Sequence, residues 1–262
     1  DKTAAPAEIP ASKKKSDKPA PIIPIPADAL PKFKTHARSK FIVERNGEPV
    51  QAWQYNHQGA PWMIVARHEK DGGKTIIPYH YAADGKWRQG NPLKTGRHLY
   101  NVDALADAAA PVLIVEGEKC ADIKVPGFVV VTWPGGSKAV HKTDWSPLKG
   151  RSVTIWPDAD DAGFSAALEI REAVPQAEIL DIVDRPKAWD AADAVAEGVE
   201  PAAFIAECPR VKEPTTAAEL FPVDAPAVMV PGLQNMPRPE KVKAILSHFF
   251  DFRYHTDRKS VV

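Results

Sequence analysis

Short apolar runs alternate with amphipathic segments in the central part of the chain, and this alternation constrains the fold more than any other feature. The runs are PVLIV at 111–115, GFVVVT at 127–132, SVTIW at 152–156 and AEILDIV at 177–183, with helical patterns at 118–123, 163–173 and 191–197. Continuous apolar runs of this length suit strands that are buried on both faces. Repeated strand–helix units predict a parallel sheet with helices on its faces, so the fold class is α/β.

Acidic or glycine-rich segments follow these predicted strands. Ligands of open parallel sheets bind beyond the carboxyl ends of the strands. Carboxylates that gather there raise one another's pKa unless a cation neutralises them, and hard oxygen ligands without nearby Cys or His suit Mg²⁺ or Mn²⁺. The residues after the four strands in turn are Glu116; Gly135 and Gly136; Asp158 and Asp160; and, after a short connection, Asp190 and Asp193.

Each of these acidic residues also has an ordinary interpretation when it is taken alone. Asp160 or Asp161 can cap the helix expected near Gly163, and Asp193 can lie on an exposed helix face. Helix capping and surface exposure explain less well why acidic residues follow three of the four predicted strands. We therefore favour a catalytic or metal-binding role for Glu116, Asp158 and Asp160.

Three segments resemble the TOPRIM domain, in the primase-like form found in phage and plasmid primase/helicase proteins. They are LIVEGEKCAD at 113–122, TWPGGSK at 132–138 and VTIWPDADDAG at 153–163, and AWDAADAVAEG at 188–198 is similar to the acidic motif that closes the domain in these members. The resemblance implies a TOPRIM-type, mostly parallel sheet over residues 103–208. Glu116 matches the glutamate of the family, and Asp158 and Asp160 match its Asp-x-Asp.

The resemblance also implies an activity, which is metal-dependent, primase-like nucleotidyl transfer in the DNA replication of a phage or another mobile element. Asp158 and Asp160 would hold Mg²⁺, and Glu116 would be a further ligand or the general base. Asp190 and Asp193 would bind a second cation through water. The expected substrates are NTPs and a single-stranded DNA template.

Phosphate contacts are expected from Lys119 and from Lys138, which follows the Gly135-Gly136 pair. Backbone N–H groups of such a glycine turn can bind an anion. A solvated helix residue and a simple turn are equally good interpretations of Lys119 and of the glycine pair.

Residues 33–102 predict a small antiparallel, β-rich subdomain. The segments at 40–44, 50–55, 62–68 and 75–81 are rich in aromatic and β-branched residues, and glycine-containing turn signals separate them. Trp53, Trp62 and Trp87 either fill the core of this sheet, which we favour, or join a nucleic-acid face. The resemblance extends to the segment that ends at residue 101, which belongs to the primase core in those proteins.

A formal charge of zero conceals a pattern along the chain. The 34 basic side chains balance 34 acidic ones, which taken alone argues against a nucleic-acid partner. By segment, the net charge is +5 over 1–40, +3 over 41–102, −10 over 103–208 and +2 over 209–262. The acidic block is the expected cation site, and a phosphate backbone would lie on the basic flanks. The candidate contacts, for which solvated surface charge is the alternative, are Arg67, Lys70, Lys74, Arg88, Lys94 and Arg97.

The two ends of the chain differ in composition from the centre. The Pro- and Lys-rich residues 1–32 predict a disordered linker, and residues 209–262 predict a second linker and the start of a truncated C-terminal domain, with a helix over 239–250. Two cysteines cannot form a four-cysteine zinc site, and the eight histidines show no Cys/His ligand spacing, so a zinc finger is not expected in this chain. A Walker A loop is missing, so a helicase would be a separate domain or protein. No apolar run is long enough for a membrane span, and the low cysteine content favours a cytoplasmic protein.

Two other functions use the same residues. A TOPRIM nuclease would apply the same metal to hydrolysis, and a non-catalytic module would bind nucleotides or single-stranded DNA and recruit a helicase. A topoisomerase needs a nucleophilic tyrosine on a separate domain, and none of the five tyrosines suits that role. Metal-dependent synthesis of oligonucleotides would separate the primase-like function from the other two.

Overall fold

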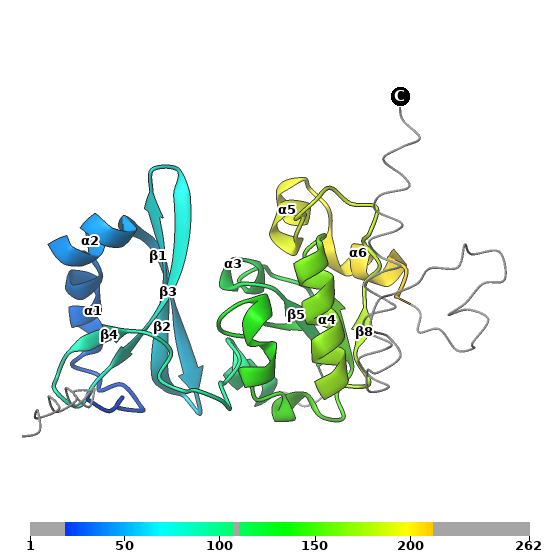
Figure 1. Ribbon diagram of the computed structural model, residues 1–262. Coiled ribbons are helices and arrows are strands. Elements are labelled where there is room, and N and C mark those ends of the chain that lie inside the picture. The colour runs from blue at the N-terminus through cyan, green and yellow to red at the C-terminus, as the bar shows by residue number, and fades with distance from the viewer. Residues whose placement is uncertain (1–18, 107–109, 212–262) are drawn as a thin grey trace, which may run out of the picture.

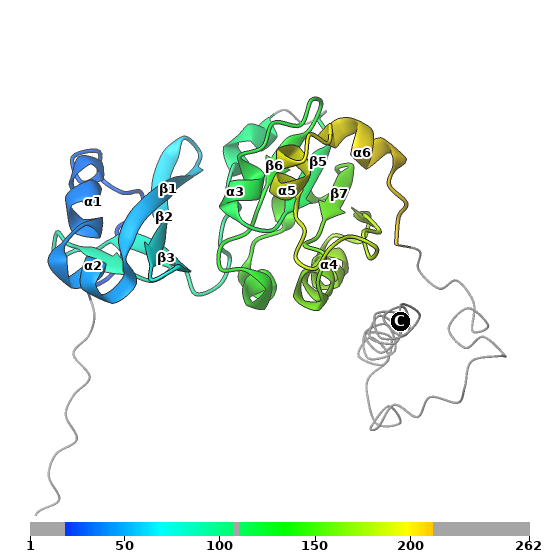
Figure 2. The same ribbon diagram turned by 90° about the horizontal axis from the view of Figure 1, so that it is seen from above.

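The computed structural model describes residues 19–106 and 110–211. They form a β-rich unit with an antiparallel sheet and an α/β unit with a parallel sheet (Figures 1 and 2). This is the α/β class, preceded by a β-rich subdomain, that the sequence predicts. The helix predicted over 239–250 and the first 18 residues lie outside the described part of the chain. No helix in the described part is long and apolar enough to cross a bilayer.

The sheet of the β-rich unit is a meander in the order β1-β2-β3-β4, and all its pairs are antiparallel. The two hairpin loops, Gln58-Gly59 and Asp71-Gly72, have positive φ at both residues, as tight hairpin turns that match the strand twist require. The predicted turn signals therefore mark the true turns, and β4 is an additional strand. The strands are β1 (Glu48–His57), β2 (Ala60–Lys70), β3 (Gly73–Tyr81) and β4 (Trp87–Gln89).

Two helices, α1 (Leu30–Ala37) and α2 (Lys40–Asn46), cover the face of this sheet that points away from the α/β unit (Figures 1 and 2). The strand predicted at 40–44 is wrong, because these residues lie in α2. Ile42 of α2 packs with Phe33 and Ala37 into the core beneath the sheet. This packing overrides the local preference of the β-branched residues for a strand.

The described part of the segment expected to be a linker, residues 19–32, packs against the β-rich unit. The Ile22 N–H donates to the Tyr81 carbonyl at 2.8 Å, and Ile25 is buried in the core of the unit. The chain then enters α1 at Leu30. These residues therefore belong to the folded unit, because their apolar side chains find partners that the local composition does not reveal.

The sheet of the α/β unit has the order β6-β5-β7-β8, and every neighbouring pair is parallel. This confirms the parallel sheet predicted from the apolar runs. Helix α6 and the 3₁₀ helices are additions that the sequence analysis does not anticipate. The elements are η1 (Val102–Ala106), β5 (Val112–Val115), α3 (Glu118–Ala121), β6 (Val129–Val131), η2 (Ser137–Lys142), η3 (Ser146–Leu148), β7 (Val153–Trp156), α4 (Asp161–Ala173), β8 (Glu178–Ile179), α5 (Ala191–Ala196) and α6 (Pro201–Glu207).

Helices lie on both faces of this sheet. In β5, Val112 and Ile114 join the core cluster that contains Ile170 of α4, while Leu113 and Val115 join the cluster formed with α3, α5 and α6. Alternate residues of β5 thus belong to two different cores, one on each face of the sheet. This explains why the strand is apolar throughout. Because β5 and β7 are neighbours, the residues that follow them meet at one edge of the sheet.

Candidate functional site

Glu116 and Asp158 stand at the same edge of the parallel sheet. Glu116 directly follows Val115, the last residue of β5, and Val115 is paired with Trp156, the last residue of β7. Asp158 lies two residues beyond Trp156. The adjacency of the two strands therefore brings together carboxylates that are 42 positions apart in the sequence.

The Asp158 carboxyl lies in a negative field. Burial, as the largest cause, and the charges of Glu116, Asp190 and Asp160, in that order, together raise its pKa from 3.8 to about 8. Lys74 of β3 acts in the opposite direction. Within residues 19–106 and 110–211, no hydrogen bond or ion pair holds the Asp158 side chain. A carboxyl in this setting gains strongly from a cation.

Glu116 accepts a hydrogen bond from the glycine turn. Its Oε1 lies 3.2 Å from the Ser137 N–H, so a backbone group of this turn binds the protein's own carboxylate. Burial raises the pKa of Glu116, this hydrogen bond lowers it, and the charge of Asp160 raises it. The turn needs glycine, because Gly135 has φ +107° and an added Cβ would lie 2.9 Å from the Ala139 Cβ.

Asp160 caps α4, which is one of the interpretations that the sequence left open. Its Oδ1 accepts the Gly163 N–H at 2.8 Å, so one oxygen serves the helix. The first turn of α4 packs directly on the Asp158 backbone, where a Cβ at Gly163 would lie 2.4 Å from the Asp158 carbonyl oxygen. Gly163 therefore permits the contact that sets the position of Asp158.

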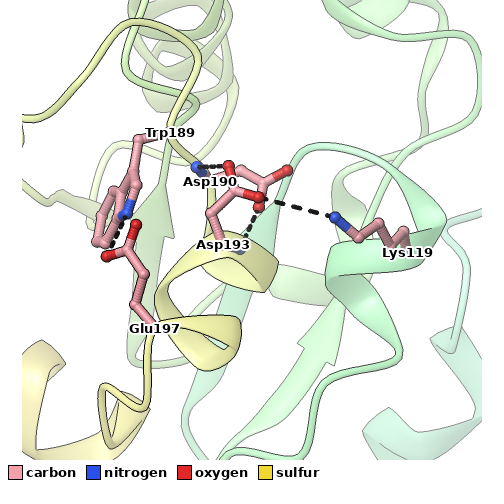
Figure 3. A network of polar contacts seen from close by, with 5 residues as sticks. All are labelled: Lys119, Trp189, Asp190, Asp193 and Glu197. Carbon is pink, nitrogen blue, oxygen red and sulfur yellow. Dashed lines mark hydrogen bonds and ion pairs between the residues drawn. The ribbon is translucent and has the colours of Figure 1, made fainter.

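Asp190 and Asp193 form a reciprocal capping box at the start of α5 (Figure 3). Asp190 Oδ1 accepts the Asp193 N–H at 2.7 Å, and Asp193 Oδ2 accepts the Asp190 N–H at 3.3 Å. Lys119 Nζ lies 3.9 Å from Asp193 Oδ1, and both side chains are about half exposed. Helix capping thus accounts for both carboxylates, and Lys119 has a local acidic neighbour. Lys138 is exposed on η2.

The carboxylates are ligands of the type that a divalent cation prefers, but they do not form a complete coordination sphere. Among the residues that the structure describes, no group of three or more His, Cys, Asp or Glu side chains is arranged to hold a metal ion. Mg²⁺ does not require a complete coordination sphere from the protein, because it is usually bound by one or two carboxylates together with water and substrate phosphates. Asp158 and Asp160, both oxygen donors, fit that mode of binding.

The strand register divides the predicted nucleic-acid contacts between two faces. Arg67 pairs with Ile76, Glu69 with Lys74 and His80 with Arg88, and paired residues of an antiparallel sheet point to the same side. Arg67, Lys74 and Arg88 therefore share the face that also carries Trp53 and Tyr55 toward the α/β unit. We call these three residues the cationic face.

The other three candidates do not belong to the cationic face. Lys70 lies on the opposite side, where its Nζ donates to the Glu44 carbonyl at 2.6 Å. Arg97 is half-buried and donates to the carbonyls of Leu93 and Pro134, so it supports the glycine turn. Lys94 is exposed in the loop after β4. Trp53, Trp62 and Trp87 are all buried, as the favoured core interpretation predicts.

Two acidic residues on the first turn after β5 make contacts that no sequence motif predicted. Glu118 accepts the Tyr55 hydroxyl at 2.8 Å, and Asp122 accepts the Trp53 indole N–H at 2.7 Å. Both bonds cross from the β-rich unit to the α/β unit. The available signals were the four-residue spacing of the two acids and the two-residue spacing of the two aromatics.

Comparison with known proteins gives matches only among solved structures. No protein-family model matches the sequence, and no curated protein matches it. Three matched structures, all with a TM-score of 0.34, are a DNA primase domain from Pseudomonas aeruginosa (16% identity), the bacteriophage T7 lagging-strand DNA polymerase with primase domains of two gp4 subunits bound to an RNA/DNA hybrid and dTTP (17%), and the zinc-binding and RNA polymerase domains of the Aquifex aeolicus primase (15%).

The matches cover different shares of the chains. They span 59%, 64% and 74% of this chain, and 54%, 85% and 51% of the Pseudomonas, T7 and Aquifex chains. The matched region thus spans about half the length of the two bacterial primases. At these identities and TM-scores the likeness supports no functional argument, and the proposal below depends on the residues of this chain.

Proposed function

We propose that this protein is a metal-dependent, primase-like nucleotidyltransferase that acts in DNA replication. Glu116, Asp158 and Asp160 are its catalytic carboxylates, and its substrates are NTPs and a single-stranded DNA template. A phage or another mobile element is the proposed setting, and a helicase is the proposed partner. The setting and the partner follow from the TOPRIM resemblance of the sequence.

One observation carries the proposal, which is the electrostatic state of Asp158. The pKa of this carboxyl is raised to about 8, and its neighbours Glu116, Asp190 and Asp160 all carry the same sign of charge. A buried carboxyl among like charges destabilises the fold at neutral pH, and such groups cluster at functional sites. Its place beyond the carboxyl end of a central parallel strand is where such sheets bind ligands.

Each carboxylate has its own task in the proposal. Asp158 and Asp160 would hold a Mg²⁺ or Mn²⁺ ion, which would supply positive charge to the phosphates of the bound nucleotide. Glu116 would take the proton from the 3′-hydroxyl as this attacks the α-phosphate of the NTP and pyrophosphate leaves. Burial keeps the affinity of Glu116 for a proton high. The proposed phosphate contacts are Lys119, Lys138 and the turn at Gly135-Gly136. Asp190 and Asp193 are proposed to bind a second cation through water, beside their role as a cap.

The template is proposed to run along the cationic face. Lys74 of this face lowers the pKa of Asp158, so positive charge on the sheet acts at the carboxylate edge. Exposed Ile76 lies on the same face beside Arg67 and offers apolar contact to an unstacked base. Phosphate contacts supply most of the affinity of such surfaces, whereas stacking tolerates any sequence.

The decisive experiment measures oligonucleotide synthesis on single-stranded DNA with NTPs and Mg²⁺ or Mn²⁺. We expect synthesis by the wild type and a loss of at least about 100-fold in Asp158→Asn, because the variant replaces a charged metal ligand by a neutral one. Asp161→Asn is the matched control, since Asp161 is exposed on the first turn of α4 and should leave the rate unchanged.

Two other outcomes would overturn the proposal. Metal-dependent cleavage of the DNA without synthesis would identify a nuclease that uses the same carboxylates. Binding of nucleotide or DNA with no reaction, and unchanged in Asp158→Asn, would identify a non-catalytic module that recruits a helicase.

A further inference from the structure

A row of side chains on β1 reaches across to α3 and to the segment before η1. Tyr55 and Trp53 point to the same side of the strand because they are two residues apart. The Tyr55 hydroxyl donates to Glu118 Oε1 at 2.8 Å, and the Trp53 indole N–H donates to Asp122 Oδ2 at 2.7 Å. Tyr100 donates its hydroxyl to the other oxygen of Asp122 at 2.9 Å.

The contact between Tyr55 and Glu118 is enclosed, whereas Asp122 is an exposed residue. Tyr55 is fully buried, Trp53 is 4% exposed and Glu118 is 7% exposed. A hydrogen bond to an enclosed carboxylate is stronger than one in water, and removing its donor leaves a buried acceptor unsatisfied. The Tyr55–Glu118 bond therefore holds the two units together more firmly than the bond from Trp53 to the exposed Asp122.

The location of the bonds ties them to the proposed site. Helix α3 begins two residues after Glu116, so the chain that carries this carboxylate runs directly into the anchored helix. The same face of the same sheet carries Lys74, two strands away from Trp53. Whatever holds β1 on α3 also sets where the cationic face stands with respect to the carboxylate edge.

We propose that Tyr55 and Trp53, bonded to Glu118 and Asp122, form a latch whose task is to position the cationic face opposite Glu116 and Asp158. The four residues are positioning residues and do not touch the substrate. This inference concerns the arrangement of the two units, and only its consequence for template binding depends on the proposed function.

The first test measures a distance and needs no activity. Nitroxide labels are attached to cysteines at Lys86→Cys in the β-rich unit and Glu172→Cys on α4, both at exposed positions, while the native Cys120 and Cys208 are buried. Pulsed electron spin resonance gives the distribution of label distances in the full chain. A sample without introduced cysteines shows how much the native thiols contribute.

The latch variant is Tyr55→Phe/Trp53→Phe, and Tyr79→Phe/Trp62→Phe is its matched control. The control removes one buried tyrosine hydroxyl and one buried indole from the same sheet. Tyr79 bonds to His68 within the β-rich unit, and the Trp62 indole N–H has no hydrogen-bond partner in the described part of the chain. The Trp62 ring also packs against Tyr55 and His98, and Phe keeps an aromatic ring at this position. Only the latch variant therefore breaks hydrogen bonds between the units.

We expect the latch variant to broaden the distance distribution or to add a second population, and the control to keep the single distribution of the wild type. An unchanged distribution in the latch variant, or an equal broadening in both variants, would overturn the inference. If the double variant does not fold, Tyr55→Phe alone is compared with Tyr79→Phe by the same criterion.

The second test asks whether the latch acts through Lys74. We expect Lys74→Ala to weaken binding of a labelled single-stranded DNA by about 3- to 5-fold in the wild type and by less than about 2-fold in the latch variant, because contacting groups are energetically coupled. Equal losses in both backgrounds would overturn the link to the cationic face. A protein that shows the expected distances but no synthesis of oligonucleotides would disprove the proposed function and leave the latch in place.

Discussion

The two units each enclose an ionisable side chain near the end of a central strand, and they treat it in opposite ways. His68 in the β-rich unit is fully buried, and its two ring nitrogens lie 2.9 Å from the Gly47 carbonyl and the Tyr79 hydroxyl. Asp158 in the α/β unit is half-buried, and burial together with the charges of Glu116, Asp190 and Asp160 raises its pKa. A satisfied buried group stabilises a fold, whereas an unsatisfied one marks the place where a ligand is expected.

The units also differ in how they use charge. The β-rich unit places Arg67, Lys74 and Arg88 on one side of a sheet, and Arg67 and Arg88 also pair with nearby carboxylates. The α/β unit collects carboxylates at one edge. The two arrangements are complementary, which suits a negatively charged polymer on one unit and a cation on the other.

The largest effect expected on stability comes from the contact between α4 and Asp158. Gly163→Ala should lower the free energy of unfolding by about 2–3 kcal/mol, because the new methyl group overlaps the Asp158 carbonyl and the helix must move. Gly73→Ala in the β-rich unit is the control, since its Cβ would lie 3.4 Å from the nearest atom. Urea denaturation measures both, and equal losses would contradict the special role of the Gly163 contact.

The second prediction concerns the pH dependence of the metal-free protein. The folded pKa of Asp158, about 8, lies above the ordinary value of 3.8, so its contribution to stability is complete below pH 4 and is lost as the pH rises to 8. Asp158→Asn removes this loss and should be more stable than the wild type by about 1–3 kcal/mol at pH 8.

The difference between the two proteins should shrink toward pH 4, where the wild-type carboxyl is protonated. Thermal unfolding at several pH values measures it, with Asp161→Asn as a variant whose difference from the wild type should not follow this trend. A constant difference between wild type and Asp158→Asn would mean that burial and the neighbouring charges do not raise the pKa of Asp158.

The third prediction compares helix caps in the two units. Asp190→Ala removes the capping box of α5 and should cost about 1 kcal/mol of unfolding free energy. Ser39→Ala at the N-cap of α2 should cost less than about 0.5 kcal/mol, because the Ser39 side chain makes no capping bond. Chemical denaturation of both variants checks the order, which a larger loss in Ser39→Ala would reverse.

The smallest effect is expected in nucleic-acid binding. Lys74→Ala should weaken binding of single-stranded DNA by about 3- to 5-fold and reduce the salt dependence by about 0.7 in the log–log slope. Lys70→Ala removes the same charge from the same hairpin but from the opposite face, and should change binding by less than about 2-fold. Fluorescence anisotropy at several salt concentrations separates the two variants, and similar losses would remove the distinction between the faces.

Local patterns identified the main elements well. The runs at 111–115 and 152–156 contain β5 and β7, and the turn signals at Gln58-Gly59 and Asp71-Gly72 mark the hairpins. These features depend on neighbours in sequence, such as side-chain alternation and the backbone preference of glycine. The strand predicted at 40–44 failed for the opposite reason, since its helix is stabilised by packing on a distant sheet.

The candidate site divides in the same way. That carboxylates stand at the strand exits could be read from the chain, because a buried strand must end where its apolar run ends. Whether Asp160 caps a helix, or Lys119 faces Asp193, could not be read, since each depends on where a second element lies. The bonds of Tyr55 to Glu118 and of Trp53 to Asp122 join residues more than 60 positions apart.

The amino-acid order alone thus predicted the parallel sheet and the acidic residues at its carboxyl edge. Apolar runs depend only on neighbours in the sequence, and the end of each run shows which residues follow the strand. Tertiary structure decided that β5 and β7 are neighbours, that Asp158 is enclosed among like charges, and that Lys74 and Lys70 lie on opposite faces. The reason is that burial, pKa shifts and inter-unit hydrogen bonds depend on distances across the fold, which no local pattern contains.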